Sequence, residues 1–273
     1  MNTRFLSWLM LPMLLLLAGC PSNGGGDGGF GEAAPSNVAV SPNGSFLYVS
    51  NRGSNSVFAY TIGATGALTA IAGSPFPAGT NPSAVEVSPN GDFLYVSNEG
   101  SNDVSAYMIG GTGALTPVTG SPFAAGTTPS GVAVSPNNAF LYVSNQGSNN
   151  VSAYTITAVT GVLVPLVSGV GNPFVAGTSP SGVTVSPNGD FLYVSNQGSN
   201  NVSAYTITAV TGVLVPLISG VGNPFAAGTS PSGVTVSPNG SFLYVSNQGS
   251  NNVSAFTITV GTGVLASIAG SPF

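Results

Sequence analysis

One phrase of 15 residues recurs five times in this chain and constrains the fold more than any other feature. It reads Ser-Pro-Asn-x-x-Phe-Leu-Tyr-Val-Ser-Asn-x-Gly-Ser-Asn and begins at Ser41, Ser88, Ser135, Ser186 and Ser237. Successive copies are therefore 47, 47, 51 and 51 residues apart. A fixed period of about 20–50 residues is typical of repeat architectures, in which each repeat is one unit that packs on its neighbours.

Each repeat has the pattern of four short strands. In the first repeat these are 36–40, 46–49, 57–62 and 68–71, separated by turn residues such as Asn43-Gly44. The second strand, Phe-Leu-Tyr-Val, is apolar on both faces, so it should be covered on both sides. Four antiparallel strands in about 40–50 residues indicate a propeller blade. The sequence therefore predicts an all-β fold, a β-propeller of five four-stranded antiparallel blades.

We expect the five blades to form a closed ring, because the last residues, Ser271-Pro272-Phe273, match the end of a fourth strand. Only Phe30-Gly31-Glu32 could imitate an outer strand shared between the two termini. Closure would then depend on blade 5 packing face to face against blade 1. The alternatives are an open array, a truncated ring or a self-associating one.

Charge is scarce, which excludes several classes of function. Only 3% of the residues are charged, no histidine is present, and the two basic residues are Arg4 and Arg52. Nucleic-acid binding needs several Lys or Arg on one face, as does a basic patch for anionic lipids. No spacing of acids resembles a calcium or zinc site, so we expect neither a metal nor a cofactor.

The N-terminal segment has the pattern of an export leader. Arg4 precedes an apolar stretch that is too short for a confident membrane span, and Leu17-Ala18-Gly19-Cys20 follows it. This ending resembles the lipobox of bacterial lipoproteins, which implies lipidation at Cys20 and, with Pro21 next, location at the outer membrane. We expect a signal peptide at 1–19, a lipidated cysteine and Gly-rich tether at 20–34, and the propeller at 35–273.

The repeat also resembles a known family. Pro-Ser-x-Val-x-Val-Ser-Pro-Asn-Gly-x-Phe-Leu-Tyr-Val-Ser-Asn, with Ser-Asn-x-Val-Ser-Ala-Tyr-Thr-Ile, Thr-Gly-x-Leu and Gly-Ser-Pro-Phe after it, is similar to the lactonase-type propeller repeat. That group includes 6-phosphogluconolactonases and YVTN-repeat surface proteins. The resemblance implies a propeller and allows a lactone hydrolase. Members usually have seven blades and use charged residues and histidine, so no catalytic residue transfers by position.

Three charged residues remain weak catalytic candidates. Arg52 and Glu99 occupy the same position in adjacent repeats and are expected to form a surface ion pair between blades. Glu86 replaces Ala or Thr on the innermost strand. A carboxylate near a narrow axis could have a raised pKa and act as a base, or could be solvated in a channel.

Polar residues recur where the second strand of each repeat ends, on what should be one rim of the propeller. They are predicted to form a ligand-binding rim for a glycan or protein, or else to satisfy their own turns. The rim residues are Asn51, Arg52, Asn98, Glu99, Asn145, Gln146, Asn196, Gln197, Asn247 and Gln248.

The near-identity of the repeats favours binding over catalysis. Repeats three and four differ at only four of 51 aligned positions. Catalysis needs different groups at different angles, whereas equal blades supply the same weak contact several times. We expect an envelope-anchored binding or display module and leave enzymatic activity uncertain. The alternatives are a lactonase acting on a sugar lactone and a repeat array without function.

Overall fold

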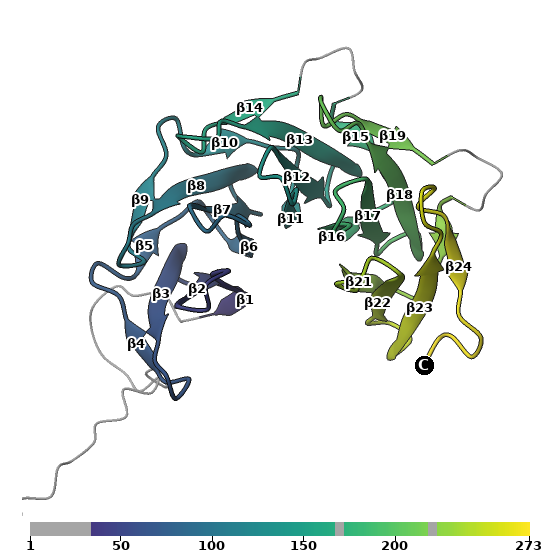
Figure 1. Cartoon of the computed structure of the whole chain (residues 1–273), viewed down its shortest axis with the longest axis horizontal. Helices are drawn as coiled ribbons and strands as arrows, with labels where there is room; N and C mark the ends of the chain where they lie inside the picture. Colours follow the sequence, from purple (N-terminus) through teal and green to yellow (C-terminus); the bar gives the residue numbers. More distant parts are fainter. Residues whose placement is uncertain (1–33, 167–171, 218–222) are drawn as a thin grey trace, which may run out of the picture.

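The described part of the chain is an all-β arc of five blades (Figure 1). The computed structural model describes residues 34–166, 172–217 and 223–273. Each blade is one twisted antiparallel sheet whose innermost strand lies on the concave side of the arc. The blades follow one another in sequence order, so each packs on the blades that precede and follow it.

The strand bounds repeat from blade to blade. Blade 1 comprises β1 (Pro35–Val40), β2 (Phe46–Asn51), β3 (Ser56–Ile62), β4 (Leu68–Ala70) and β5 (Phe76–Pro77). Blade 2 comprises β6 (Pro82–Val87), β7 (Phe93–Asn98), β8 (Asp103–Ile109), β9 (Leu115–Pro117) and β10 (Phe123–Ala124). Blade 3 comprises β11 (Pro129–Val134), β12 (Phe140–Asn145), β13 (Asn150–Ile156), β14 (Leu163–Pro165) and β15 (Phe174–Val175).

The last two blades follow the same plan. Blade 4 comprises β16 (Pro180–Val185), β17 (Phe191–Asn196), β18 (Asn201–Ile207), β19 (Leu214–Pro216) and β20 (Phe225–Ala226). Blade 5 comprises β21 (Pro231–Val236), β22 (Phe242–Asn247), β23 (Asn252–Ile258) and β24 (Leu265–Ser267). In blade 5 the backbone of Phe273 pairs with Val253 where the other blades carry a fifth strand.

The four predicted strand positions are confirmed, with one refinement at the outer edge. There the outermost position is divided into two short pieces. In blade 1, β4 pairs with the second half of β3, from Tyr60 to Ile62, and β5 pairs with its first half, at Ser56 and Val57. The sequence prediction treated Phe76 as the end of a strand and missed this short second piece.

The hydrophobic core lies between blades rather than inside them. The four buried clusters each combine the forward face of one blade with the backward face of the next. In the cluster between blades 4 and 5, Tyr193 and Val202 come from blade 4, and Leu243 and Val245 come from blade 5. Both faces of a middle blade are therefore buried, as the doubly apolar Phe-Leu-Tyr-Val strand predicts.

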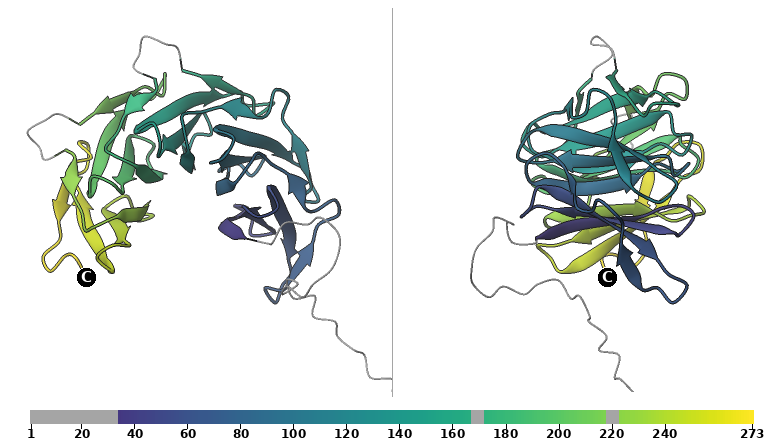
Figure 2. Two further views of the ribbon diagram at one scale, coloured as in Figure 1. Left: turned by 180° about the vertical axis from the view of Figure 1, so that it is seen from behind. Right: turned by 90° about the vertical axis from the view of Figure 1, so that its left-hand side faces the viewer.

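The expected closed ring is wrong, because the five blades form an open arc. Figure 1 and the left view of Figure 2 show a wide gap between blade 1 and blade 5. The inner strands of adjacent blades contact each other from β1 to β21, and the predicted seam between the end blades does not form. The angle between neighbouring blades is set by their side-chain packing, and at this angle five blades do not complete a circle.

Candidate functional site

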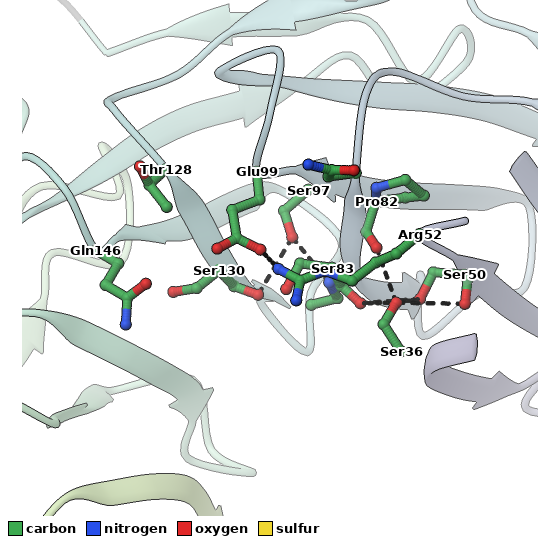
Figure 3. Close-up of polar contacts among 12 residues, drawn as sticks. Ser36, Ser50, Arg52, Pro82, Ser83, Ser97, Glu99, Thr128, Ser130 and Gln146 are labelled. Carbon is green, nitrogen blue, oxygen red and sulfur yellow. Dashed lines mark hydrogen bonds and ion pairs between the residues drawn. The ribbon is translucent and has the colours of Figure 1, made fainter. Parts of the chain in front are cut away.

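A row of five side chains follows the concave rim of the arc, one from each blade. Each member directly follows the last residue of the second strand, at the start of the turn to the third strand. We call this set the rim row; its members are Arg52, Glu99, Gln146, Gln197 and Gln248. Its first members lie beside the serines that join blades 1, 2 and 3 (Figure 3).

The backbone of the rim row is held by the segments that enter each inner strand. The amide of Glu99 donates to the carbonyl of Asn81 at 2.9 Å, and the next amide, Gly100, donates to Thr80 at 2.9 Å. Gln146 and Gly147 bond to Thr128 and Thr127 in the same way in blade 3. The row is therefore presented on a fixed backbone, which suits recognition better than a mobile loop does.

Neighbouring side chains of the row pair across two of the four blade boundaries. Arg52 and Glu99 form an ion pair between blades 1 and 2, which confirms the interpretation made from their shared repeat position. The side chain of Arg52 is 44% exposed, so some of its five N–H donors remain accessible. Between blades 3 and 4, the Nε2 atom of Gln146 donates to the Oε1 atom of Gln197 at 2.9 Å.

The asparagines that precede the row are buried, and they bond to nearby side chains and backbone groups. In blade 3, the Nδ2 atom of Asn145 donates to Asn150 Oδ1 at 2.8 Å and to Ser152 Oγ at 2.9 Å, and its Oδ1 atom accepts from the amide of Gly126. Ligand binding by the rim stays a prediction, and the side chains placed to meet a ligand are those of the rim row. The buried set is Asn51, Asn98, Asn145, Asn196 and Asn247.

Glu86 lies on the inner strand β6, away from the ion pair. It pairs with Tyr95 on β7, whereas Pro82, at the rim end of β6, pairs with Asn98. Four residues of strand span roughly 13 Å. Arg52, Glu99 and Glu86 therefore line the same concave side of the arc without forming one cluster.

The side chain of Glu86 is partly buried. Its side chain lies on the same face of β6 as that of Ala84, which packs against the core cluster between blades 2 and 3. Desolvation by burial raises the pKa of Glu86 to about 7. The carboxyl group therefore exchanges its proton near neutral pH, as a general base requires.

A set of serines on the second strands was missed by sequence reasoning. Ser50 Oγ donates to the carbonyl of Ser83 in the next blade at 2.8 Å, and Ser195 Oγ donates to Ser232 at 2.8 Å (Figure 3 draws the first). Their signal was the constant Ser before each rim asparagine, which sequence reasoning used only as part of the repeated phrase. These hydroxyls connect blades near the rim.

The described ranges contain neither a candidate metal site nor a candidate membrane-spanning helix. No group of three or more His, Cys, Asp or Glu residues lies close enough to hold a metal ion there. No helix in residues 34–166, 172–217 and 223–273 is long and apolar enough to cross a membrane. Cys20, the signal peptide and most of the tether lie outside the described residues, so those expectations remain predictions.

Comparison with known proteins identifies the family. The family model described as "Lactonase, 7-bladed beta-propeller" matches residues 25–77, 69–175 and 168–272. The chain belongs to this lactonase family. The lactonase-type resemblance of the repeat is thereby confirmed. The structure describes five blades, whereas the family description gives seven. The smaller number agrees with an open arc rather than a closed ring.

Individual relatives of this lactonase-family chain are distant. A 6-phosphogluconolactonase of Formosa agariphila is 36% identical over 85 residues, which is 30% of this chain and 23% of that protein. The matched stretch therefore spans less than a quarter of that curated relative.

Solved structures match over most of the chain. A candidate 6-phosphogluconolactonase of Bacteroides fragilis is 22% identical with a TM-score of 0.71, covering 85% of this chain and 68% of that one. The periplasmic gluconolactonase of Pseudomonas aeruginosa is 22% identical with a TM-score of 0.69, covering 87% and 71%. At these identities the similarity shows the fold, and the arc has the curvature of those larger propellers.

Proposed function

We propose that this chain is a lactone hydrolase that opens a sugar lactone on the concave side of the arc. Membership of the lactonase family and the relatives named as 6-phosphogluconolactonase and gluconolactonase support this activity. The single observation within the chain that carries the proposal is Glu86, a carboxyl group on an inner strand with a pKa of about 7. This conclusion reverses the preference for a binding module that repeat symmetry suggested.

The proposed reaction uses Glu86 as the general base and Arg52 as the group that binds the substrate. The Glu86 carboxylate takes a proton from a water molecule, whose oxygen attacks the lactone carbonyl carbon. The bond between that carbon and the ring oxygen then breaks, and the ring oxygen receives the proton, giving the open hydroxy acid. Arg52 at the rim binds an anionic group of the substrate, such as a phosphate, through N–H donors not used by Glu99.

The experiment is hydrolysis of a sugar δ-lactone, with and without a 6-phosphate, by residues 21–273. Glu86→Gln should lower kcat/KM at least about 100-fold, because a general base contributes roughly that much or more. Asp190→Asn is the matched control, since it removes an exposed carboxylate from a turn of blade 4. For the unmodified protein, kcat/KM should rise with pH to a plateau with a midpoint near pH 7. Absence of turnover by that protein, or full activity of Glu86→Gln, would contradict the proposal.

A second candidate function is binding of a glycan or protein ligand by the rim row. The Gln146–Gln197 pair favours it, because two nearly identical blades present the same amides side by side. Such a ligand should bind more weakly in steps as Gln146→Ala and Gln197→Ala are combined. Equal affinity of the double variant would exclude this rim.

We also propose that the protein is exported and anchored to the envelope, at the outer membrane, by lipid on Cys20. The apolar run before Leu17-Ala18-Gly19-Cys20 supports this proposal. Acyl chains contribute about 0.8 kcal/mol per buried methylene, so several chains on one residue give stable attachment. Cys20→Ser should move the protein from the membrane fraction to the soluble fraction. An unchanged distribution would contradict the anchor.

A further inference from the structure

The contact between adjacent blades is one interface used four times. A tyrosine on the second strand donates its hydroxyl to the carbonyl of a glycine in the next blade: Tyr48 to Gly113, Tyr95 to Gly161, Tyr142 to Gly212, and Tyr193 to Gly263, at 2.9 to 3.2 Å. The phenylalanine two residues before each tyrosine packs on the same glycine, where a Cβ atom would lie only 2.3–2.5 Å from its ring. We call the Phe–Tyr pair the knob and the glycine turn the socket.

Blade 5 carries a free knob. Phe242 and Tyr244 correspond to Phe191 and Tyr193, but no described residue supplies a socket for them. Tyr244 is 40% exposed, whereas Tyr193 is fully buried. The same face exposes Val253 to 39%, although the equivalent valines, including Val202, are fully buried.

The free knob already has the shape of an occupied one. The ring centroids of Phe242 and Tyr244 are 6.4 Å apart with an interplanar angle of 36°. In the occupied knob of blade 4, the Phe191 and Tyr193 rings are 6.5 Å apart at 39°. Binding would therefore require little rearrangement of these side chains, which lowers its cost.

Blade 1 carries the matching free socket. Gly66 has a φ of +82°, close to the +81° of Gly113, yet no heavy atom of the described residues lies within 4 Å of the position of its Cβ atom. Around it, Leu68 is 50% exposed while the equivalent Leu115 in blade 2 is only 6% exposed. Val38 on the inner strand of this face is also exposed.

We propose that blade 5 of one copy of this chain docks on blade 1 of a second copy, with the Phe242–Tyr244 knob in the Gly66 socket. The contact would also place Ser246 of the first copy where it can donate to the Ser36 carbonyl of the second, as Ser195 does to Ser232. The two surfaces differ, so the contact is head-to-tail rather than symmetric. Residues 237–273 contain no charged side chain, so no side-chain charge of blade 5 has to be desolvated in this contact.

The curvature of the arc limits how such copies assemble. The curvature of the arc matches that of larger structures, and the family is seven-bladed. The gap between blade 1 and blade 5 is therefore too narrow to hold a second arc of five blades. Two copies therefore either close a wider ring of ten blades through two equal contacts, which requires a clearly smaller angle between all neighbouring blades, or continue as a chain displaced along the axis. Both assemblies use the same contact.

The test measures the mass of residues 21–273 by sedimentation equilibrium over a range of concentrations. Three variants change exposed side chains only: Tyr244→Lys on the knob face, Leu68→Lys on the socket face, and the control Val159→Lys on an outer turn of blade 3. The unchanged protein and the control should associate. Tyr244→Lys and Leu68→Lys should each weaken association at least about tenfold, because a buried unpaired charge costs more than 1.4 kcal/mol.

Mixing the two interface variants gives the decisive result. Tyr244→Lys keeps a good socket and Leu68→Lys keeps a good knob, so the mixture should form a pair with one contact although neither variant associates alone. A monomeric unchanged protein at its highest soluble concentration would overturn the proposal. So would association that survives Tyr244→Lys, because another surface would then be responsible. The same measurement with residues 34–273 tests whether residues 21–33 cover an end face. If only this shorter chain associates, the proposal is overturned for residues 21–273.

Discussion

Tyr193 in blade 4 and Tyr244 in blade 5 occupy the same position in nearly identical repeats, yet only Tyr193 is fully buried. The residues around them within their own blades are almost the same. The difference comes from the next blade, which supplies Gly263 to Tyr193 and nothing described to Tyr244. Stability in this arc is therefore a property of neighbouring pairs of blades, as in other repeat proteins.

Removal of the Tyr193 ring or the Tyr244 ring should give the largest difference in stability between blades 4 and 5. Tyr193→Ala should lower the free energy of unfolding by about 3–5 kcal/mol, the usual cost of emptying a buried aromatic site. Tyr244→Ala should cost under about 1 kcal/mol in the monomer, because much of that ring already meets water. Guanidinium unfolding followed by circular dichroism measures both. Equal losses of stability would mean that Tyr244 is covered as fully as Tyr193 in solution.

The socket glycines give the next largest difference. Gly212→Ala and Gly66→Ala both place a side chain at positive φ, which costs roughly 1–2 kcal/mol. At Gly212 the new Cβ atom would also lie 2.3 Å from the Phe140 ring, whereas at Gly66 it would have no neighbour within 4 Å among the residues that the structure describes. Overpacking should add about 1–3 kcal/mol at Gly212 alone. Thermal unfolding of the two variants separates the clash from the shared backbone cost, and equal shifts in Tm would contradict a packed socket.

The sequence pattern within one repeat predicted the strands of each blade, but it did not predict the angle between neighbouring blades. The doubly apolar Phe46–Val49 strand implied cover on both faces, and turn residues such as Asn43-Gly44 marked the strand ends. The interblade contact uses the same tyrosine and glycine at every boundary, so nothing in one repeat states how many repeats complete a circle. The expected closed ring failed for this reason.

The site was predicted in part. The equal repeat positions of Arg52 and Glu99 indicated a pair across two blades, because equivalent residues of neighbouring repeats lie side by side. A raised pKa was one of the two alternatives predicted for Glu86 from its inner-strand position, and its cause is desolvation by burial. The hydroxyl bonds from serines such as Ser50 could not be seen, since their acceptors are backbone carbonyls that carry no sequence signal.

The same inner-strand position should titrate differently in a middle blade and an end blade. Because the pKa of Glu86 is raised from 4.5 to about 7, the folded state holds this proton more tightly than the unfolded state. Its contribution to stability is therefore full below about pH 4.5 and is lost as the pH rises through 7. Relative to Glu86→Gln, the unmodified protein should lose up to about 3 kcal/mol across this window.

Blade 5 provides the control for this titration. Thr235 is the equivalent of Glu86 there and is exposed, so the carboxylate of Thr235→Glu should stay solvated. The free energy of unfolding of the Thr235→Glu variant should therefore depend on pH in the same way as that of the unmodified protein. Urea unfolding at a series of pH values measures all three proteins. An added loss for Thr235→Glu of the size seen with Glu86 would show that the position itself, rather than cover by a neighbouring blade, raises the pKa.

The smallest expected difference concerns the rim row. Glu99→Gln converts the ion pair with Arg52 into the kind of side-chain contact that Gln146 and Gln197 already make between blades 3 and 4. Arg52 is 44% and Glu99 24% exposed, so the pair is partly open to water. Ion pairs near the surface contribute about 0–1 kcal/mol, so the loss should be at most that and should fall in high salt, which screens the charges. Asp190→Asn, which removes an exposed and distant acid, controls for net charge. A loss well above 1 kcal/mol that persists in 1 M salt, where the Debye length is about 3 Å, would mean that blades 1 and 2 depend on this pair in a way that blades 3 and 4 do not.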